Sequence, residues 1–211
     1  LHPGRFVLGL GVSHGPLVEN MLGGTYEKPL ATMRGYLDRM AALPEAIEPG
    51  SGRPTRLLAA LGPKMIELSG THADGAHPYL VNPAQTAVTR EILGPDKWVV
   101  SEQAVVVGED DDEQLRRAHL HLQIYSGLPN YRNSWIRQGF DESDFVPGGS
   151  ERLARGIVGM GSVEQAAATV TAHLDAGADH VVVQVLGDGN PAWDPRPALR
   201  ELAEVLRPAT A

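Results

Sequence analysis

The sequence predicts an α/β protein built from parallel βαβ units, and two observations lead to that prediction. Short apolar runs rich in valine and leucine alternate along the chain with longer segments whose apolar residues recur every three or four positions. Glycine and proline, 24 and 16 residues, are spread along the whole chain and suit many short loops. An open doubly wound sheet and a closed (β/α)8 barrel both use this alternation, and both place function at the carboxyl ends of the strands.

The first part of the chain predicts two strands and two helices. Residues 5–12 form a short apolar run that ends in glycines and predict a buried strand. Residues 29–43 predict a helix because a proline suits its first turn and its apolar residues share one face. Residues 46–55 are rich in proline and glycine and predict a loop. Residues 56–61 predict the next buried strand, and residues 64–73 the next helix.

The middle of the chain continues the alternation. Residues 75–81 predict a third strand, which Pro78 should end because proline cannot donate to a sheet ladder. Residues 82–93 begin with an asparagine and a proline, which are signals for an N-cap and a first helical turn. Residues 98–107 carry five valines and predict a fourth strand, and residues 110–126 predict a long helix.

The last part of the chain predicts three helices and one strand. After a stretch with proline and glycine, residues 150–160 and 162–176 predict helices, and Gly177 should end the second of them. Residues 180–186 predict a fifth strand, and residues 197–206 a final helix. The first predicted strand begins so close to the start of the sequence that we expect the natural protein to extend upstream.

Composition and charge exclude several classes of function. Lys and Arg number 18 against 26 Asp and Glu, a net charge of −8, and no basic run is present. We therefore expect no nucleic-acid partner, since neutralising phosphates needs clustered Lys and Arg. No apolar run reaches the roughly 18–20 residues that span a bilayer, so we expect no membrane partner. The absence of cysteine excludes disulfides and a Cys nucleophile, and it fits a cytoplasmic protein.

The loop after the first predicted strand is the first candidate site. Glycines at the end of a strand let a flat ring or a phosphate approach the backbone, and Ser13 and His14 would then point into the site. A strict G-x-G-x-x-G pattern would begin at Gly9 and Gly11 but meets His14 at its third position, so the dinucleotide fingerprint fails. The alternative is a tight turn that binds nothing.

Two further loops follow strands in the same way. Residues 61–65 join a strand to a helix, and backbone N–H groups there with Lys64 would suit an anion such as a phosphate. The alternative is a compact turn with a solvated lysine. His77, Pro78 and Tyr79 lie at the end of the third predicted strand, where they could stack on a ring or simply pack the mouth of a barrel.

Other polar groups offer weaker candidate sites. Tyr131 and Arg132 could line a pocket, or belong to a helix interruption with exposed polar groups. The acidic run 110–113 is most simply a helix start that matches the helix dipole. His119 and His121 are two residues apart and face different directions on a helix, so we expect no metal site. The hydrolase elbow and the Gly-Lys-Ser/Thr phosphate loop are both missing.

Seven motifs taken together resemble a known family. They are Val12-Ser-His-Gly-Pro16, Tyr26-Glu-Lys-Pro-Leu30, Met33-Arg-Gly-Tyr-Leu37, Leu61-Gly-Pro-Lys-Met65, Ala73-Asp-Gly-Ala-His-Pro-Tyr-Leu80, Gly127-Leu-Pro-Asn-Tyr-Arg-Asn133 and Ala176-Gly-Ala-Asp-His-Val-Val-Val-Gln184. The chain thus resembles the luciferase-like monooxygenase superfamily, and within it the oxidoreductases that depend on the deazaflavin coenzyme F-420. The likeness extends over nearly the whole chain.

The resemblance implies a (β/α)8 TIM barrel of the bacterial luciferase type. Residues 1–211 would form a single partial barrel domain whose visible strands are numbers four to eight, with the first three βα units absent from this chain. The cofactor ring would lie at the carboxyl mouth of the barrel. The residues implied to bind the cofactor are Gly11, Val12, Ser13, Gly62, Pro63, Lys64, Met65, His77, Pro78 and Tyr79.

The function implied by the resemblance is hydride transfer between a reduced deazaflavin and a small organic substrate. His14 is the candidate for a catalytic polar partner near the reacting carbon, and Lys64 for a contact with the cofactor phosphate. Two alternatives stay open: an FMN-dependent monooxygenase of the same fold, and a non-catalytic partial barrel that serves as an interaction subunit. Family likeness also implies a homodimer.

Overall fold

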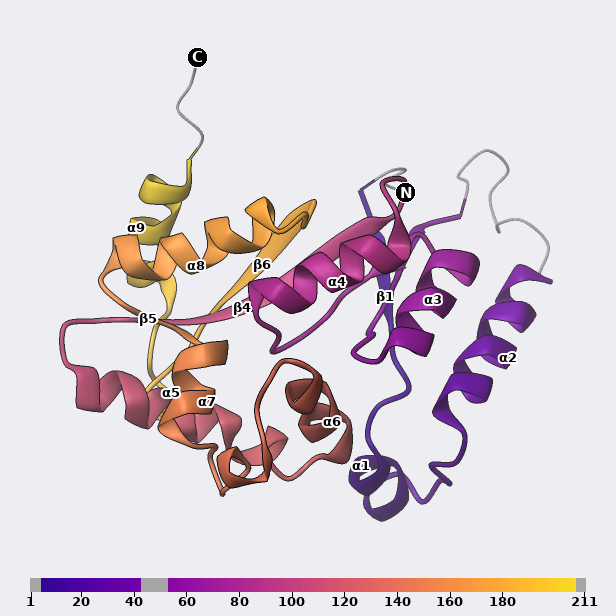
Figure 1. Ribbon diagram of the computed structural model, residues 1–211, viewed down its shortest axis with the longest axis horizontal. Helices are drawn as coiled ribbons and strands as arrows, with labels where there is room; N and C mark the ends of the chain where they lie inside the picture. Colours follow the sequence, from indigo (N-terminus) through magenta and orange to yellow (C-terminus); the bar gives the residue numbers. More distant parts are fainter. Residues whose placement is uncertain (1–4, 43–52, 208–211) are drawn as a thin grey trace.

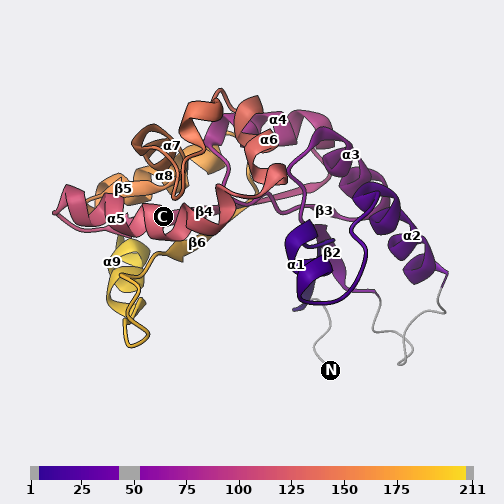
Figure 2. The ribbon, with the colours of Figure 1, turned by 90° about the horizontal axis from the view of Figure 1, so that it is seen from below.

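A computed structural model describes residues 5–42 and 53–207, which form a parallel sheet with helices around it. Figure 2 shows the elements following an arc, with α2, α3 and α4 on the outside of strands β2 and β3. The strands are β1 (Val7–Leu10), β2 (Thr55–Leu58), β3 (Gly75–Ala76), β4 (Trp98–Val107), β5 (Gly159–Gly161) and β6 (His180–Val185). This curvature is what a part of a barrel requires.

Nine α-helices connect or flank these strands in the described part of the chain. In Figure 1, α8 lies above β4, and α5, α6 and α7 lie below it. The helices are α1 (Gly15–Asn20), α2 (Pro29–Ala41), α3 (Pro63–His72), α4 (Pro83–Leu93), α5 (Asp111–Tyr125), α6 (Pro129–Arg137), α7 (Glu151–Ile157), α8 (Val163–Asp175) and α9 (Arg196–Leu206). A short 3₁₀ turn, η1, covers Glu142–Asp144.

All strand pairs in the sheet are parallel, which confirms the βαβ prediction. The strands β1, β2, β3 and β4 pair in that order. The long strand β4 pairs with β6 along residues 100–105 and with β5 at residues 105–107. The five predicted strands are therefore present, and β5 is a sixth that the sequence did not indicate. Its three residues, two of them glycine, are too few for a periodic pattern.

The seven predicted helices are present with slightly different ends, and their starts carry the caps that the sequence indicated. Asn82 Oδ1 accepts from the N–H of Gln85 at 2.9 Å. Asp110 Oδ1 accepts from the N–H of Glu113 at 3.0 Å. The acidic run is therefore the start of α5, as the sequence predicted. Residues 46–52 of the predicted loop lie outside the described residues.

Three predictions about local structure were wrong. The first strand is not buried: Val7 is 46% exposed, because among the described residues β1 pairs with β2 alone. The third predicted strand is only two residues long and ends at Ala76, ahead of Pro78. The stretch around Tyr131 is no interruption with exposed groups but the helix α6, whose Tyr131 and Trp135 are buried.

A buried polar network joins α4, α8 and β4. Gln103 Nε2 donates to two backbone carbonyls, so its Oε1 must accept from His173 Nε2 at 2.8 Å. The other ring nitrogen, Nδ1, then accepts from the Thr86 hydroxyl at 2.8 Å, and Ser101 donates to Thr86 at 2.9 Å. Every donor in this hydrogen-bond network has an acceptor only when the imidazole of His173 is neutral. Burial lowers the pKa of His173 from 6.5 to about 4.

We expect this histidine to make the fold sensitive to acid. Because the pKa of His173 is lower in the native state, the unfolded chain takes up the proton first. Stability is then complete above about pH 6.5 and is lost as the pH falls towards 4, by about 3 kcal/mol. Urea unfolding of the wild type and His173→Gln from pH 7 to pH 4 should show their difference shrinking by that amount. The exposed His180→Gln is the control, and a constant difference between wild type and His173→Gln would contradict the prediction.

Candidate functional site

The carboxyl ends of β1, β2 and β3 meet at one edge of the sheet and surround a cavity of about 370 Å³. We call it the site cavity. It is lined by Gly11, Val12, Ser13, His14, Tyr26, Pro29, Ala59, Ala60, Leu61, Gly62, Met65, His77, Tyr79, Asn130 and Tyr131. Its floor and sides are mostly apolar, with a small number of polar groups, which is the usual make-up of a small-molecule site.

The structure brings together eight of the eleven site residues that the sequence and the resemblance suggested: His14, Gly11, Val12, Ser13, Gly62, Met65, His77 and Tyr79. The other three lie elsewhere. Pro63 and Lys64 are the exposed first residues of α3, and Lys64 lines a separate groove of about 410 Å³ with Arg34 and His72. Pro78 is buried and does not line the site cavity.

The loop of residues 11–14 has an unusual backbone that the surrounding structure holds in place. Ser13 has a φ of +62°, in the left-handed region that side chains seldom adopt. The Tyr26 hydroxyl donates to the Ser13 carbonyl at 3.1 Å and fixes this conformation. A Cβ on Gly11 would lie 3.2 Å from the Cβ of Ala59, so glycine here allows the ends of β1 and β2 to approach closely. Such strained loops concentrate at functional sites.

His14 is half-buried and carries one polar atom that no described residue contacts. Its ring lies 5.6 Å from the ring of Tyr131, centroid to centroid, at an angle of 48°. Its Nδ1 is buried and has no hydrogen-bond partner among the described residues. A buried polar atom without a partner carries a free-energy penalty, so its presence in a cavity indicates a group that a ligand can satisfy.

His77 lines the same cavity from the residue directly after β3. Its Nδ1 donates to the carbonyl of Val100 at 2.6 Å, and its backbone N–H donates to the carbonyl of Leu58 at 2.7 Å. These two contacts fix the ring and leave Nε2 as the nitrogen that can accept a hydrogen bond.

Tyr79 is held by a hydrogen-bond network at its hydroxyl. That hydroxyl donates to Gln184 Oε1 at 2.7 Å and accepts from Tyr125 at 3.4 Å. Since its single proton is used, His121 Nε2 must donate to it, at 3.1 Å. Burial, the hydrogen bond with Tyr125 and the charge of Glu102 raise the pKa of Tyr79, in that order. This phenol therefore stays protonated and orders the wall of the site.

The sequence pointed to one of the two residues of helix α6 that line the site cavity and missed the other. Tyr131 lines the cavity, which agrees with the interpretation that it lines a pocket. Burial raises the pKa of Tyr131. Arg132 does not line it: its guanidinium donates to the carbonyls of Ser126 and Phe145 and so ties loops together. Asn130 and Tyr26 also line the cavity, and no spacing in the sequence pointed to them.

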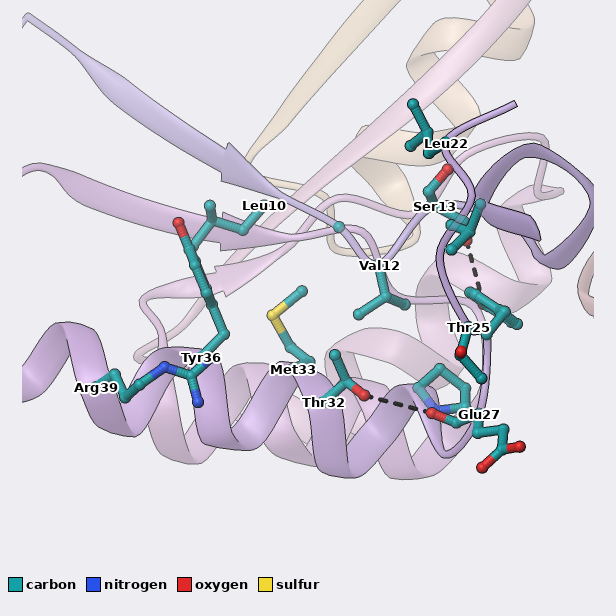
Figure 3. Close-up of a pocket in the computed structure, with 14 residues that line it drawn as sticks. Leu10, Val12, Ser13, Leu22, Thr25, Glu27, Thr32, Met33, Tyr36 and Arg39 are labelled. Carbon is teal, nitrogen blue, oxygen red and sulfur yellow. Dashed lines mark hydrogen bonds between the residues drawn. The ribbon is translucent and has the colours of Figure 1, made fainter. Parts of the chain in front are cut away.

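A second cavity, of about 400 Å³, lies on the other side of the loop of residues 11–13. Figure 3 shows Val12 from the loop and Met33 from α2 facing each other across it, with Tyr36 directed towards Leu10. The two cavities share Gly11, Val12, Ser13, Tyr26 and Pro29 as common walls. The loop is therefore a partition, and a change in its conformation would alter both spaces.

The site cavity fits the tricyclic ring of a flavin or deazaflavin by its chemistry. Its apolar side is formed by Ala59, Ala60 and Leu61, and the missing Cβ of Gly11 lets a flat ring lie against the backbone. His14 Nδ1 offers an unused polar atom beside it. Its volume lies within the range of about 300–1,000 Å³ for small-molecule sites.

Comparison with families of known proteins gives a match over residues 1–185 to the family described as luciferase-like monooxygenase. Among curated protein sequences, none matches the chain. The fold is similar to several solved structures at low sequence identity, and such similarity bears on the fold alone.

Three of those structures are similar over nearly all of this chain. An F-420-dependent secondary alcohol dehydrogenase, in complex with an F-420–acetone adduct, has a TM-score of 0.71 at 13% identity, with 98% of this chain and 71% of that one covered. A coenzyme F-420 dependent tetrahydromethanopterin reductase from Methanopyrus kandleri has a TM-score of 0.62 at 16% identity, covering 95% and 72%.

The third similar structure binds a different cofactor. It is a type II Baeyer–Villiger monooxygenase, the oxygenating constituent of 3,6-diketocamphane monooxygenase from the CAM plasmid of Pseudomonas putida, in complex with FMN. Its TM-score is 0.55 at 16% identity, covering 95% of this chain and 69% of that one.

The described residues provide neither a membrane-spanning helix nor a cluster of metal ligands. Residues 5–42 and 53–207 contain no helix that is both long and apolar enough to cross a membrane. The same residues contain no group of three or more His, Asp or Glu side chains placed to hold a metal ion.

Proposed function

The chain belongs to the luciferase-like monooxygenase family, and from that premise we propose that it is an oxidoreductase that holds coenzyme F-420 in the site cavity. It would move a hydride between the reduced deazaflavin and a small organic substrate. The observation that carries this proposal is the buried, unpartnered Nδ1 of His14 beside an apolar wall at the carboxyl ends of β1 and β2. That arrangement offers one polar contact to a ring that is otherwise held by apolar surface.

The chain's own residues would bind and orient, while the cofactor, when bound, supplies the hydride chemistry. Gly11 and Ala59 would let the ring lie close to the backbone. His14 would hydrogen-bond a polar atom near the reacting carbon. Tyr79, fixed by Gln184 at 2.7 Å, would close one wall and exclude water. Lys64 lies in the separate groove, so any phosphate contact from it would form outside the site cavity.

F-420 is proposed ahead of FMN because both the motifs and two of the similar structures point to deazaflavin enzymes. Because one similar structure is in complex with FMN, FMN is the second cofactor to be tested. Titrating the protein separately with F-420 and FMN and measuring fluorescence quenching should show binding of F-420 at least about tenfold tighter. Tight FMN binding without F-420 binding would overturn the proposal in favour of a monooxygenase. Binding of neither would favour a non-catalytic interaction subunit.

The role of His14 is tested with the same assay. His14→Phe keeps the ring contact with Tyr131 and removes the polar atom, so F-420 affinity should fall by about tenfold, the worth of one hydrogen bond. The exposed His180→Phe is the matched control and should bind like the wild type. Equal affinity of His14→Phe and wild type would remove His14 from the site.

A further inference from the structure

A buried carboxyl group lies directly behind the site cavity. Glu102 is in the middle of β4 and is 2% exposed. It does not line the cavity, yet its charge affects the pKa of both Tyr79 and Tyr131, which do. A buried carboxyl needs an explanation, because burying such a group carries a large free-energy penalty unless it is paired.

Glu102 holds the chain on both sides of Tyr79. Its backbone N–H donates to the carbonyl of Pro78 at 3.0 Å, and its Oε2 accepts from the N–H of Leu80 at 3.1 Å. Leu80 has a φ of +53°, a conformation that needs support from its surroundings. The indole N–H of Trp135 adds to this support, because it donates to the Leu80 carbonyl at 3.0 Å.

Tyr79 is thus fixed at its two ends by different elements. Glu102 on β4 holds its backbone, and Gln184 on β6 holds its hydroxyl. If the contact with Leu80 weakened, the backbone end would be free to shift while the hydroxyl stayed tied. The ring of Tyr79, which forms a wall of the site cavity, would then change its tilt.

The second oxygen of Glu102 makes the carboxyl sensitive to protonation. Oε1 is buried and has no hydrogen-bond partner among the described residues. Burial raises the pKa of Glu102 to about 7, partly offset by the hydrogen bond from Leu80. The titratable groups on the packed elements around it are the phenols of Tyr79 and Tyr131 and, beyond them, Tyr125, His77 and His121.

We propose that Glu102 is a positioning residue that holds Tyr79 against the site cavity, and that cofactor binding there responds to whether Glu102 is ionised. The second half of this inference rests on the proposed function, and the first half does not. An ionised carboxylate accepts from Leu80 in a charge-assisted hydrogen bond, which is roughly twice as strong as a neutral one. Protonation therefore loosens the hold on Tyr79.

The positioning role is tested without any ligand. We would compare the wild type, Glu102→Gln, which keeps an acceptor for Leu80, and Glu102→Leu, which removes it. Exchange of the Leu80 amide proton, followed by NMR, should be at least about tenfold faster in Glu102→Leu and within about threefold of wild type in Glu102→Gln. Equal exchange in all three proteins would overturn the role.

The protonation step has its own readout. Infrared spectra of the wild type should contain the carbonyl band of a protonated carboxylic acid at about pH 5.5, which disappears by about pH 8.5 and is missing from Glu102→Gln. If that band does not titrate in this range, or persists in Glu102→Gln, the assignment of the proton to Glu102 is wrong.

The link to binding is measured with F-420 and FMN as probes. Between about pH 8.5 and pH 6 the affinity of the wild type should fall about fivefold relative to Glu102→Gln. Parallel pH profiles for the two proteins would overturn the link. If neither probe binds the wild type, the proposed function fails and the link fails with it. The amide-exchange and infrared results still decide the positioning role in that case.

Discussion

Replacing Gly75 with alanine is expected to destabilise the protein by more than about 3 kcal/mol or to prevent folding. The new Cβ would lie 2.0 Å from the carbonyl oxygen of Trp98 and 2.7 Å from its carbonyl carbon. These are backbone atoms of β4, and Gly75 pairs with Trp98 in the parallel ladder. The clash can be relieved only by moving two paired strands apart.

The measurement is urea unfolding of wild type and Gly75→Ala, followed by circular dichroism. Gly9→Ala on β1 is the matched control, because a Cβ there meets nothing within 4 Å and the change should be nearly neutral. A Gly75→Ala protein as stable as Gly9→Ala would mean that β3 and β4 are not paired in this register.

The effect of Gly75 also shows which features of this fold the sequence could predict. Strand β4 was predicted with its bounds because ten residues with five valines leave no other interpretation. Strand β3 was predicted too long, because an apolar run shows which residues prefer burial but not where the ladder ends. Beyond the end of β3 the backbone turns at Leu80, and the left-handed φ of this residue has no sequence signal, since leucine rarely adopts it.

Helix α6 was missed for a related reason. It begins at Pro129 and carries Asn and Arg near its start, so its local preference is for a turn. Burial of Tyr131 and Trp135 decides its conformation, and burial depends on neighbours that are distant in sequence. Tertiary packing here overrides the local preference.

The candidate site, too, could be predicted from the sequence only in part. Glycines and histidines at the ends of predicted strands could be placed together in advance, because the carboxyl ends of parallel strands share one edge. The direction in which a side chain points could not be predicted from the sequence. Lys64 follows a strand closely, yet it lies on the outer surface of α3. Glu102 lies in the middle of a strand that is buried on both sides, and nothing in the sequence of that strand marks it as a group that holds Tyr79.

Replacing Ala59 with tryptophan is expected to lower F-420 affinity by at least about 100-fold while leaving the fold intact. Ala59 lines the site cavity and is exposed, so a larger side chain there displaces no core residue. Its backbone N–H donates to the carbonyl of Leu10 at 2.8 Å, and the substitution keeps this bond. The indole would then occupy much of a space of about 370 Å³ that a flat ring needs.

Cofactor titration and urea unfolding of the same samples separate blocked binding from misfolding. Ala168→Trp, at an exposed position of α8, is the matched control and should bind like the wild type. A stable Ala59→Trp protein that no longer binds would place the ring against the ends of β1 and β2. Wild-type affinity in Ala59→Trp would instead move the ring out of the site cavity. The second cavity, across the loop of residues 11–13, would become the place to search, because it shares that loop and does not include Ala59.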